Sequence, residues 1–144
     1  MEKVIKLTML IGITLVSFTA CDKERVIETD ELPSNARTYI ALHFPDYEII
    51  QVVKERDDLK TTYQVFLDEG FELDFDKKGA ITSVEGTNKL PDSVIPDRIL
   101  AYVNVTYPDD FVVGWELDGA GQEIKLSNRM ELKFDKDDNF LRID

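Results

Sequence analysis

The stretch LPSNARTYIALHFP at residues 32–45 decides the fold, because a similar stretch, IPDRILAYVNVTYP, returns at residues 95–108. In both, apolar residues recur at the spacing of one helical face. Each has a proline near its start and another just past its end, which marks where a helix begins and stops. The sequence therefore predicts two similar short helices, 63 residues apart.

A second repeated stretch follows each predicted helix. FELDFDKKG at residues 71–79 is matched by MELKFDKDD at 130–138. Around both, apolar residues alternate with polar ones, the period of a strand with one buried face. Each half therefore reads as one helix followed by four strands. We expect an α+β fold in which two tandem helix–β-meander repeats form one antiparallel, curved sheet with the helices packed on one face. A half of about 60 residues buries too little surface to be stable alone, so we expect the two sheets to join edge to edge.

The N-terminus has the order of a bacterial signal peptide. Lys3 and Lys6 precede an apolar run that is too short to span a bilayer, and small residues lead to Cys21, the only cysteine of the chain. The ending FTAC resembles a lipoprotein signal, in which the cysteine carries the lipid; an ordinary signal with a chance cysteine is the alternative. We expect a signal peptide at 1–20, a tether at 21–31, repeat 1 at 32–86 and repeat 2 at 87–144.

The composition of the chain argues against several classes of function. The 144 residues are 43% hydrophobic and 32% charged, as expected of a folded chain, and the net charge is −12. Such acidity disfavours nucleic acid, whose phosphates would repel it. One cysteine and one histidine, His43, exclude a Cys- or His-rich zinc site. We expect no metal and no other cofactor.

The D-x-D pair Asp74 and Asp76 suggests three readings: a calcium loop, a catalytic carboxylate pair or a hairpin turn. In the second copy Asp135 matches Asp76, but Lys133 stands in place of Asp74. DKDDN at 135–139 lacks the glycine and the late glutamate of an EF-hand loop. The pattern favours a turn over a calcium loop. His43 is matched by Thr106, which favours a helix-end packing role over a general base.

These motifs together resemble the PepSY-like lipoproteins, small secreted proteins of Gram-negative bacteria with a fold similar to the β-lactamase inhibitor protein. The resemblance covers about residues 30–144. It implies a tandem α+β arrangement with one long curved sheet, and it implies no catalytic residues.

We expect a lipid-anchored, non-catalytic binding module of the cell envelope, on the periplasmic side or the outer surface of the outer membrane. Its partner would be an unknown protein or peptide bound on the sheet face away from the helices. Alternation turns Phe66 outward; the alternative is a bulge or a covering loop at this point. The candidate binding residues are Phe66, Ile49, Val53, Asp68, Glu72 and Asp74.

Two other functions stay open. A carboxylate-dependent hydrolase would need Glu116, Glu131, Asp74 and Asp76 gathered in a cleft. A structural envelope protein would need no specific ligand. Independently of function, Trp115 shares its predicted face with Val113 and Leu117, which predicts that all three lie in the core.

Overall fold

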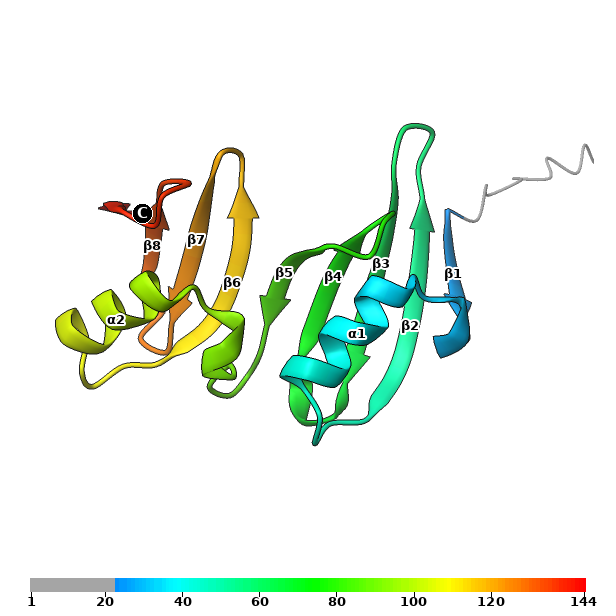
Figure 1. The fold of residues 1–144 in the computed structure, drawn as a ribbon, viewed down its shortest axis with the longest axis horizontal. Helices are drawn as coiled ribbons and strands as arrows, with labels where there is room; N and C mark the ends of the chain where they lie inside the picture. Colours follow the sequence, from blue (N-terminus) through cyan, green and yellow to red (C-terminus); the bar gives the residue numbers. More distant parts are fainter. Residues whose placement is uncertain (1–22) are drawn as a thin grey trace, which may run out of the picture.

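The computed structural model describes residues 23–144, in which one helix followed by four strands occurs twice (Figure 1). The first part comprises β1 (Glu24–Ile27), α1 (Ser34–His43), β2 (Ile49–Arg56), β3 (Thr61–Leu67), β4 (Glu72–Asp76) and β5 (Ile81–Glu85). The second comprises α2 (Asp97–Thr106), β6 (Val112–Asp118), β7 (Gly121–Leu126), β8 (Glu131–Phe134) and β9 (Phe140–Ile143). The predicted α+β class is confirmed, and so is this order of elements.

Prolines set both ends of each helix. Pro33 and Pro96 occupy the N-cap positions, and the helices end at Phe44 and Tyr107, whose N–H groups donate to Ile40 and Val103 at 2.8 Å. The next residue is a proline in each case, and a proline disfavours helical backbone in the residue before it. The repeated prolines of the sequence thus fix two helices of equal length.

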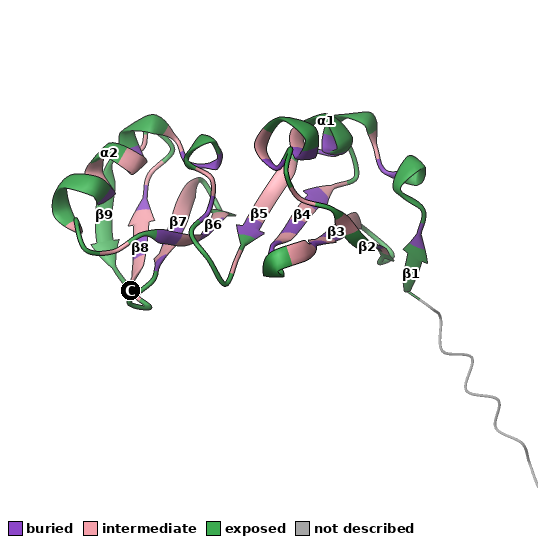
Figure 2. Cartoon of the chain, turned by 90° about the horizontal axis from the view of Figure 1, so that it is seen from below, coloured by how far each residue is buried: buried purple, intermediate pink, exposed green. Residues whose placement is uncertain are grey.

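The nine strands of residues 23–144 form one antiparallel sheet in the order of the chain, from β1 to β9. The two parts join where β5 pairs with β6, with Val84 opposite Trp115. The expected edge-to-edge union of two sheets is confirmed. Both helices lie on the same side of this sheet (Figure 2).

The core lies between the sheet and the helices. Ala36, Ile40, Ile99 and Val103 of the helices are at most 5% exposed, because their spacing turns them toward the strands. The strands contribute alternate residues, among them Val65, Leu73, Phe75, Val84, Ile124 and Leu132, all fully buried. The opposite side of the sheet is left without a covering layer among the described residues, 23–144.

The expected tether is wrong for residues 24–31. Residues 24–27 form β1, and Ile27 lies opposite Val52 at 7% exposure. Residues 29–31 form a short 3-10 helix, and Arg25 pairs with Glu31 at 2.9 Å. An edge strand is held by backbone hydrogen bonds and buries few side chains. Its sequence can therefore be charged and show no strand pattern. The predicted signal peptide and Cys21 lie outside the described residues.

The prediction for the face of β6 is right for Trp115 and wrong for its neighbours. Trp115 is 8% exposed, and its Nε1 donates to Gln122 Oε1 at 2.8 Å. The register shifts between Val112 and Gly114, so Val112 is buried in place of Val113. Leu117 is 51% exposed at the end of the strand. Strict alternation cannot detect the extra residue of a β-bulge.

None of the helices in residues 23–144 has the length and apolar character needed to cross a membrane.

Candidate functional site

The sheet face turned away from α1 and α2, called the open face below, carries two rows of side chains. One row crosses all nine strands and consists of Val26, Val53, Gln64, Asp74, Ser83, Glu116, Glu123, Lys133 and Arg142. The row beside it consists of Gln51, Phe66, Glu72, Glu85, Gly114, Lys125 and Glu131. The core residues alternate with both rows, which is why these side chains point away from the helices.

Four of the six predicted binding residues lie on this face. Phe66 lies between Gln51 and Glu72, and it is half-buried by these neighbours. Val53 and Asp74 flank Gln64 in the neighbouring row. The alternation along β3 and β4 therefore brings Phe66, Val53, Glu72 and Asp74 together as expected.

Ile49 does not belong to the open face, and its assignment to that face is wrong. The register of β2 shifts between Ile49 and Gln51, so Ile49 lies opposite the buried Leu67 and packs against the core. The shift leaves Ile50 68% exposed. The error has the same cause as that in β6, an extra residue early in the strand.

Asp68 lies in the short 3-10 turn Asp68–Gly70 after β3 and not on the sheet. Its Oδ1 accepts a hydrogen bond from the Glu48 backbone N–H at 2.9 Å, and its own N–H donates to Glu48 O at 2.9 Å. These bonds tie two loops together. Asp68 is therefore placed as a structural residue at the rim of the sheet.

The middle of the open face is acidic. Glu72 lies directly opposite Glu85, and Glu116 directly opposite Glu123. Burial, and then the charge of Glu72, raises the pKa of Asp74 to about 6. Like charges opposite one another destabilise a sheet, so this arrangement stores unfavourable electrostatic energy. A cationic partner would relieve it.

One lysine offsets part of this acidity at the C-terminal end of the face. Lys133 contacts Glu123 and Asp118, with 2.6 Å between its Nζ and Asp118 Oδ2, and both bonds raise its pKa. Burial and the Glu123 charge raise the pKa of Glu116, while Lys133 opposes the increase. The unrelieved negative charge therefore lies on β4, β5 and β6.

The carboxylates of the open face do not share one cavity. Asp74 lines a hollow of about 230 Å³ with Val53, Gln64 and Lys60, apart from the glutamates of β5 to β8. The cavity lined by Glu85, Glu116, Glu123 and Glu131 has a volume of about 40 Å³, far below the size of a ligand pocket. Asp74 and Glu116 stand two strands apart, about 10 Å between backbones. No group of three or more residues suited to hold a metal ion occurs within residues 23–144. Asp74 and Glu116 therefore do not share the cleft that a paired-carboxylate reaction needs.

The hairpin reading of Asp76 and Asp135 is confirmed. Asp76 Oδ1 accepts bonds from the N–H groups of Lys78 and Ala80 at 2.8 and 3.0 Å. Asp135 Oδ1 accepts from Asp137 and Asn139 at 2.8 and 2.9 Å. These backbone bonds lower the pKa of both carboxyls. Each aspartate thus uses its side chain to close its own turn.

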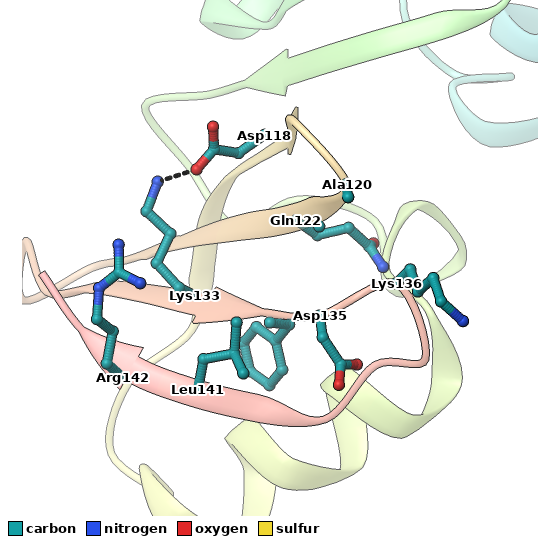
Figure 3. A pocket seen from close by; sticks show the side chains of 10 residues that line it. Asp118, Ala120, Gln122, Lys133, Asp135, Lys136, Leu141 and Arg142 are labelled. Carbon is teal, nitrogen blue, oxygen red and sulfur yellow. Dashed lines mark hydrogen bonds and ion pairs between the residues drawn. The ribbon is translucent and has the colours of Figure 1, made fainter.

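A cavity of about 300 Å³ lies between the β6–β7 turn and the β8–β9 hairpin (Figure 3). Leu141 and Phe134 supply apolar lining. Its charged groups already have partners: Lys133 bonds Asp118, and Arg142 bonds Asp144 at 2.6 Å. The cavity offers an apolar surface without a free polar group to orient a small ligand.

The sequence did not reveal that His43 meets Ser93. His43 Nδ1 and Ser93 Oγ are 2.8 Å apart, joining the end of α1 to the segment before α2. Burial lowers the pKa of His43, and the centroids of the Tyr39 ring and the imidazole are 4.3 Å apart. No carboxylate of the described chain bonds this ring, so the pair lacks the third group that orients a catalytic base. A contact between residues fifty apart leaves no local sequence signal.

Comparison with solved structures finds the same architecture in Bacteroides proteins that are provisionally described as periplasmic. A protein of the DUF2874 family from Bacteroides vulgatus matches with a TM-score of 0.80 and 38% identity, over 86% of this chain and 98% of that one. A Bacteroides thetaiotaomicron protein, provisionally described as calcium-regulated, matches with a TM-score of 0.82 and 37% identity, over 85% and 98%. A second Bacteroides vulgatus protein, of unknown function, has a TM-score of 0.79 and 31% identity, over 84% and 98%.

Sequence comparison agrees with the structural one. No curated protein matches the chain. The model of one family matches it twice, over residues 18–83 and 61–142, and this family is provisionally described as beta-lactamase-inhibitor-like and PepSY-like. The helix–strand motifs noted in the sequence lie inside the matched segments. The chain belongs to the PepSY-like family.

Proposed function

We propose that this protein is a non-catalytic binding module of the bacterial cell envelope whose open face holds a protein or peptide partner. The periplasmic relatives support the location. The proposal rests on one observation: no layer formed by residues 23–144 covers the open face. A sheet face of this extent, left uncovered, is available for a partner.

The chemistry of the open face indicates what kind of partner it fits. Val26 lies opposite Val53, and Phe66 lies diagonally from Val53, a spacing that an aromatic side chain spans. Next to this apolar strip lie the carboxylates of Glu72 and Asp74. An apolar centre beside charged residues is the usual anatomy of an interface. The acidity favours a partner with basic side chains, and association should slow as salt rises.

The lipid anchor is a further part of the proposal. Basic residues, an apolar run and small residues lead in order to Cys21. A protein is held stably at a membrane by two acyl chains, or by one acyl chain together with a second membrane contact. The anchor would hold the module at a membrane of the envelope.

We also propose that the two parts of the chain are copies of one helix–strand unit, joined into a curved sheet. Three similarities between the two parts support their being copies of one unit. The order of elements is the same, the register shifts after Asp74 in β4 and after Lys133 in β8, and Asp76 and Asp135 close equivalent turns.

Truncation of Phe66 tests the binding surface. Phe66→Ala should leave the fold intact and weaken partner capture from envelope extracts by about 1 kcal/mol or more. Leu59→Ala is the matched control, since Leu59 is fully exposed in the β2–β3 loop. If Phe66→Ala unfolds the protein or captures the partner as the wild type does, the assignment of this face is wrong.

A further inference from the structure

The β2–β3 hairpin ends in a leucine that supports no part of the fold. Asp57 and Lys60 exchange backbone hydrogen bonds at 2.8 and 3.3 Å, which closes a tight turn with Asp58 and Leu59 at its tip. Leu59 is 100% exposed, the highest value among the large apolar residues within 23–144. Turn positions usually hold glycine, proline or small polar residues, because these suit the backbone of a turn. Folding therefore does not explain a leucine at this tip.

The equivalent hairpin of the second part is shorter and has no large apolar residue at its tip. Residues 57–60 join β2 to β3, whereas only Gly119 and Ala120 join β6 to β7. The longer hairpin belongs to the part that contains the start of the described chain. A role connected with that end of the chain would account for the difference.

The longer hairpin is bonded to the segment that follows the proposed lipid anchor. The Arg56 N–H donates to Lys23 O at 2.6 Å, and Lys23 Nζ lies 3.2 Å from Asp57 Oδ1. Figure 1 shows the start of β1 and this hairpin at the same edge of the sheet. Asp22 alone separates Lys23 from Cys21 in the sequence. Since residues 24–27 form a strand and not a tether, the fold begins directly behind the proposed anchor.

The length of the chain limits how far this edge can stand from the membrane. Cys21 precedes Lys23 by two residues, which span at most about 7 Å. Leu59 follows Arg56 by three residues, which extend roughly 10 Å along the hairpin. An acyl chain on Cys21 would hold Lys23 and its partner Arg56 closer to the headgroups than the hairpin is long. Leu59 is therefore within reach of the bilayer.

The charges around the tip do not oppose such a contact. The chain as a whole is acidic, with a net charge of −12, and an anionic bilayer would repel it. At the tip, however, Asp57 and Asp58 are balanced by Lys23 and Lys60, and Lys23 pairs with Asp57. A lysine can also lay its apolar stem against lipid while its ammonium group stays among the headgroups.

We propose that the tip of the β2–β3 hairpin inserts Leu59 into the surface of the membrane that holds the lipid anchor. This inference rests on the proposed anchor at Cys21 and adds the second contact that one acyl chain needs for stable attachment. One leucine does not hold a protein at a membrane by itself, so loss of the anchor still releases the protein. Strands β2 and β3 would point at the bilayer, and the open face, which runs along them, would stay accessible to a partner.

The test supplies the anchor chemically, so that it does not depend on lipidation in cells. The chain from residue 21 onward is coupled through Cys21, its only cysteine, to a maleimide lipid in vesicles of phosphatidylcholine and phosphatidylethanolamine. Lipids with brominated acyl chains quench an indole that enters the bilayer. Leu59→Trp should lose fluorescence in these vesicles. Leu42→Trp, at a position of α1 that is 69% exposed, is the control and should behave as the wild type does.

A second measurement concerns the native leucine. With a single myristoyl chain on Cys21, attachment to vesicles is reversible and a partition coefficient can be measured by sedimentation. Leu59→Ser should lower this coefficient by about fivefold or more, because a leucine is no longer buried in lipid. Leu42→Ser makes the same change on α1 and should leave the coefficient unchanged.

The outcomes separate this contact from the rest of the proposed function. No quenching of Leu59→Trp, equal quenching of Leu42→Trp, or equal partition of Leu59→Ser and the wild type overturns the inference. Retention of Cys21→Ser in the membranes of cells would instead refute the anchor, which the vesicle measurements do not address. Leu59 lies in a turn and not on the open face, so capture of a partner from solubilised extracts is independent of both.

Discussion

At the scale of single residues, the β-bulges decide which side chains lie in the core and which lie on the surface. Trp115 was predicted to be core from a face shared with Val113 and Leu117, and it is core although those two residues are not. The burial of Val112 and Ile49 was not predicted, because each bulge adds one residue and changes the face of what precedes it. Local sequence carries no reliable sign of such an insertion.

Trp115→Ala should destabilise the protein by about 3–5 kcal/mol, the usual cost of removing a large buried side chain. The indole is 8% exposed and would also leave Gln122 Oε1 without its donor. Urea denaturation measures the change. Leu117→Ala, on the same strand but 51% exposed, is the control and should cost far less. A loss of under about 1 kcal/mol for Trp115→Ala would contradict its burial.

Asp74→Asn should make the protein more stable at neutral pH. Burial raises the folded-state pKa of Asp74 to about 6, above that of the unfolded chain, so ionisation opposes folding as pH rises toward 6. The gain of the variant should be on the order of 1 kcal/mol at pH 7, once solvent screening is allowed for, and should vanish below about pH 4. Denaturation at several pH values measures it, with Asp109→Asn in an exposed loop as control. A gain that is the same at all pH values would contradict the raised pKa.

At the scale of elements, the sequence predicted both helices and eight of the nine strands. Proline pairs and period-two alternation are local, strong signals, which is why they suffice for α1, α2 and the meanders. β1 was missed because it is an edge strand that buries one residue, Ile27. The contact of His43 with Ser93 was missed because it depends on how the two parts of the chain meet.

The β4–β5 and β8–β9 hairpins should not depend on calcium, although one structural relative is provisionally described as calcium-regulated. Asp76 and Asp135 already accept backbone hydrogen bonds within their turns. The melting temperature should therefore be unchanged by millimolar calcium, because a ligand stabilises a protein only if it binds the native state. A rise of several degrees in the wild type that is absent in Asp76→Ala would show a calcium site.

At the scale of the whole molecule, one continuous sheet covered on one side unites the two parts of the chain. The family resemblance and the repeated motifs predicted this arrangement. The candidate surface was predicted only in part: alternation placed Phe66, Val53, Glu72 and Asp74, while Ile49 and Asp68 belong to the core and to a turn. Cross-strand acidity, such as Glu116 opposite Glu123, depends on the pairing register of β6 and β7, which alternation alone does not specify.

Cys21→Ser should release the protein from the membrane fraction, because the substitution removes the sulfur that would carry the lipid. Fractionation of cells followed by immunoblotting measures this. Ser17→Ala, inside the predicted signal peptide, is the control and should remain membrane-bound. A Cys21→Ser protein that stays in the membrane without accumulation of the unprocessed form would contradict lipid anchoring.

Partner binding on the open face is the central claim, and site-specific photo-crosslinking in cells tests it most directly. A benzoylphenylalanine at position 66 places the reactive group on the open face, and one at position 42 places it on the exposed side of α1, where Leu42 is 69% exposed. We predict one discrete covalent adduct from position 66 and none from position 42. Adducts from position 42 alone, or the same adduct from both positions, would contradict the claim.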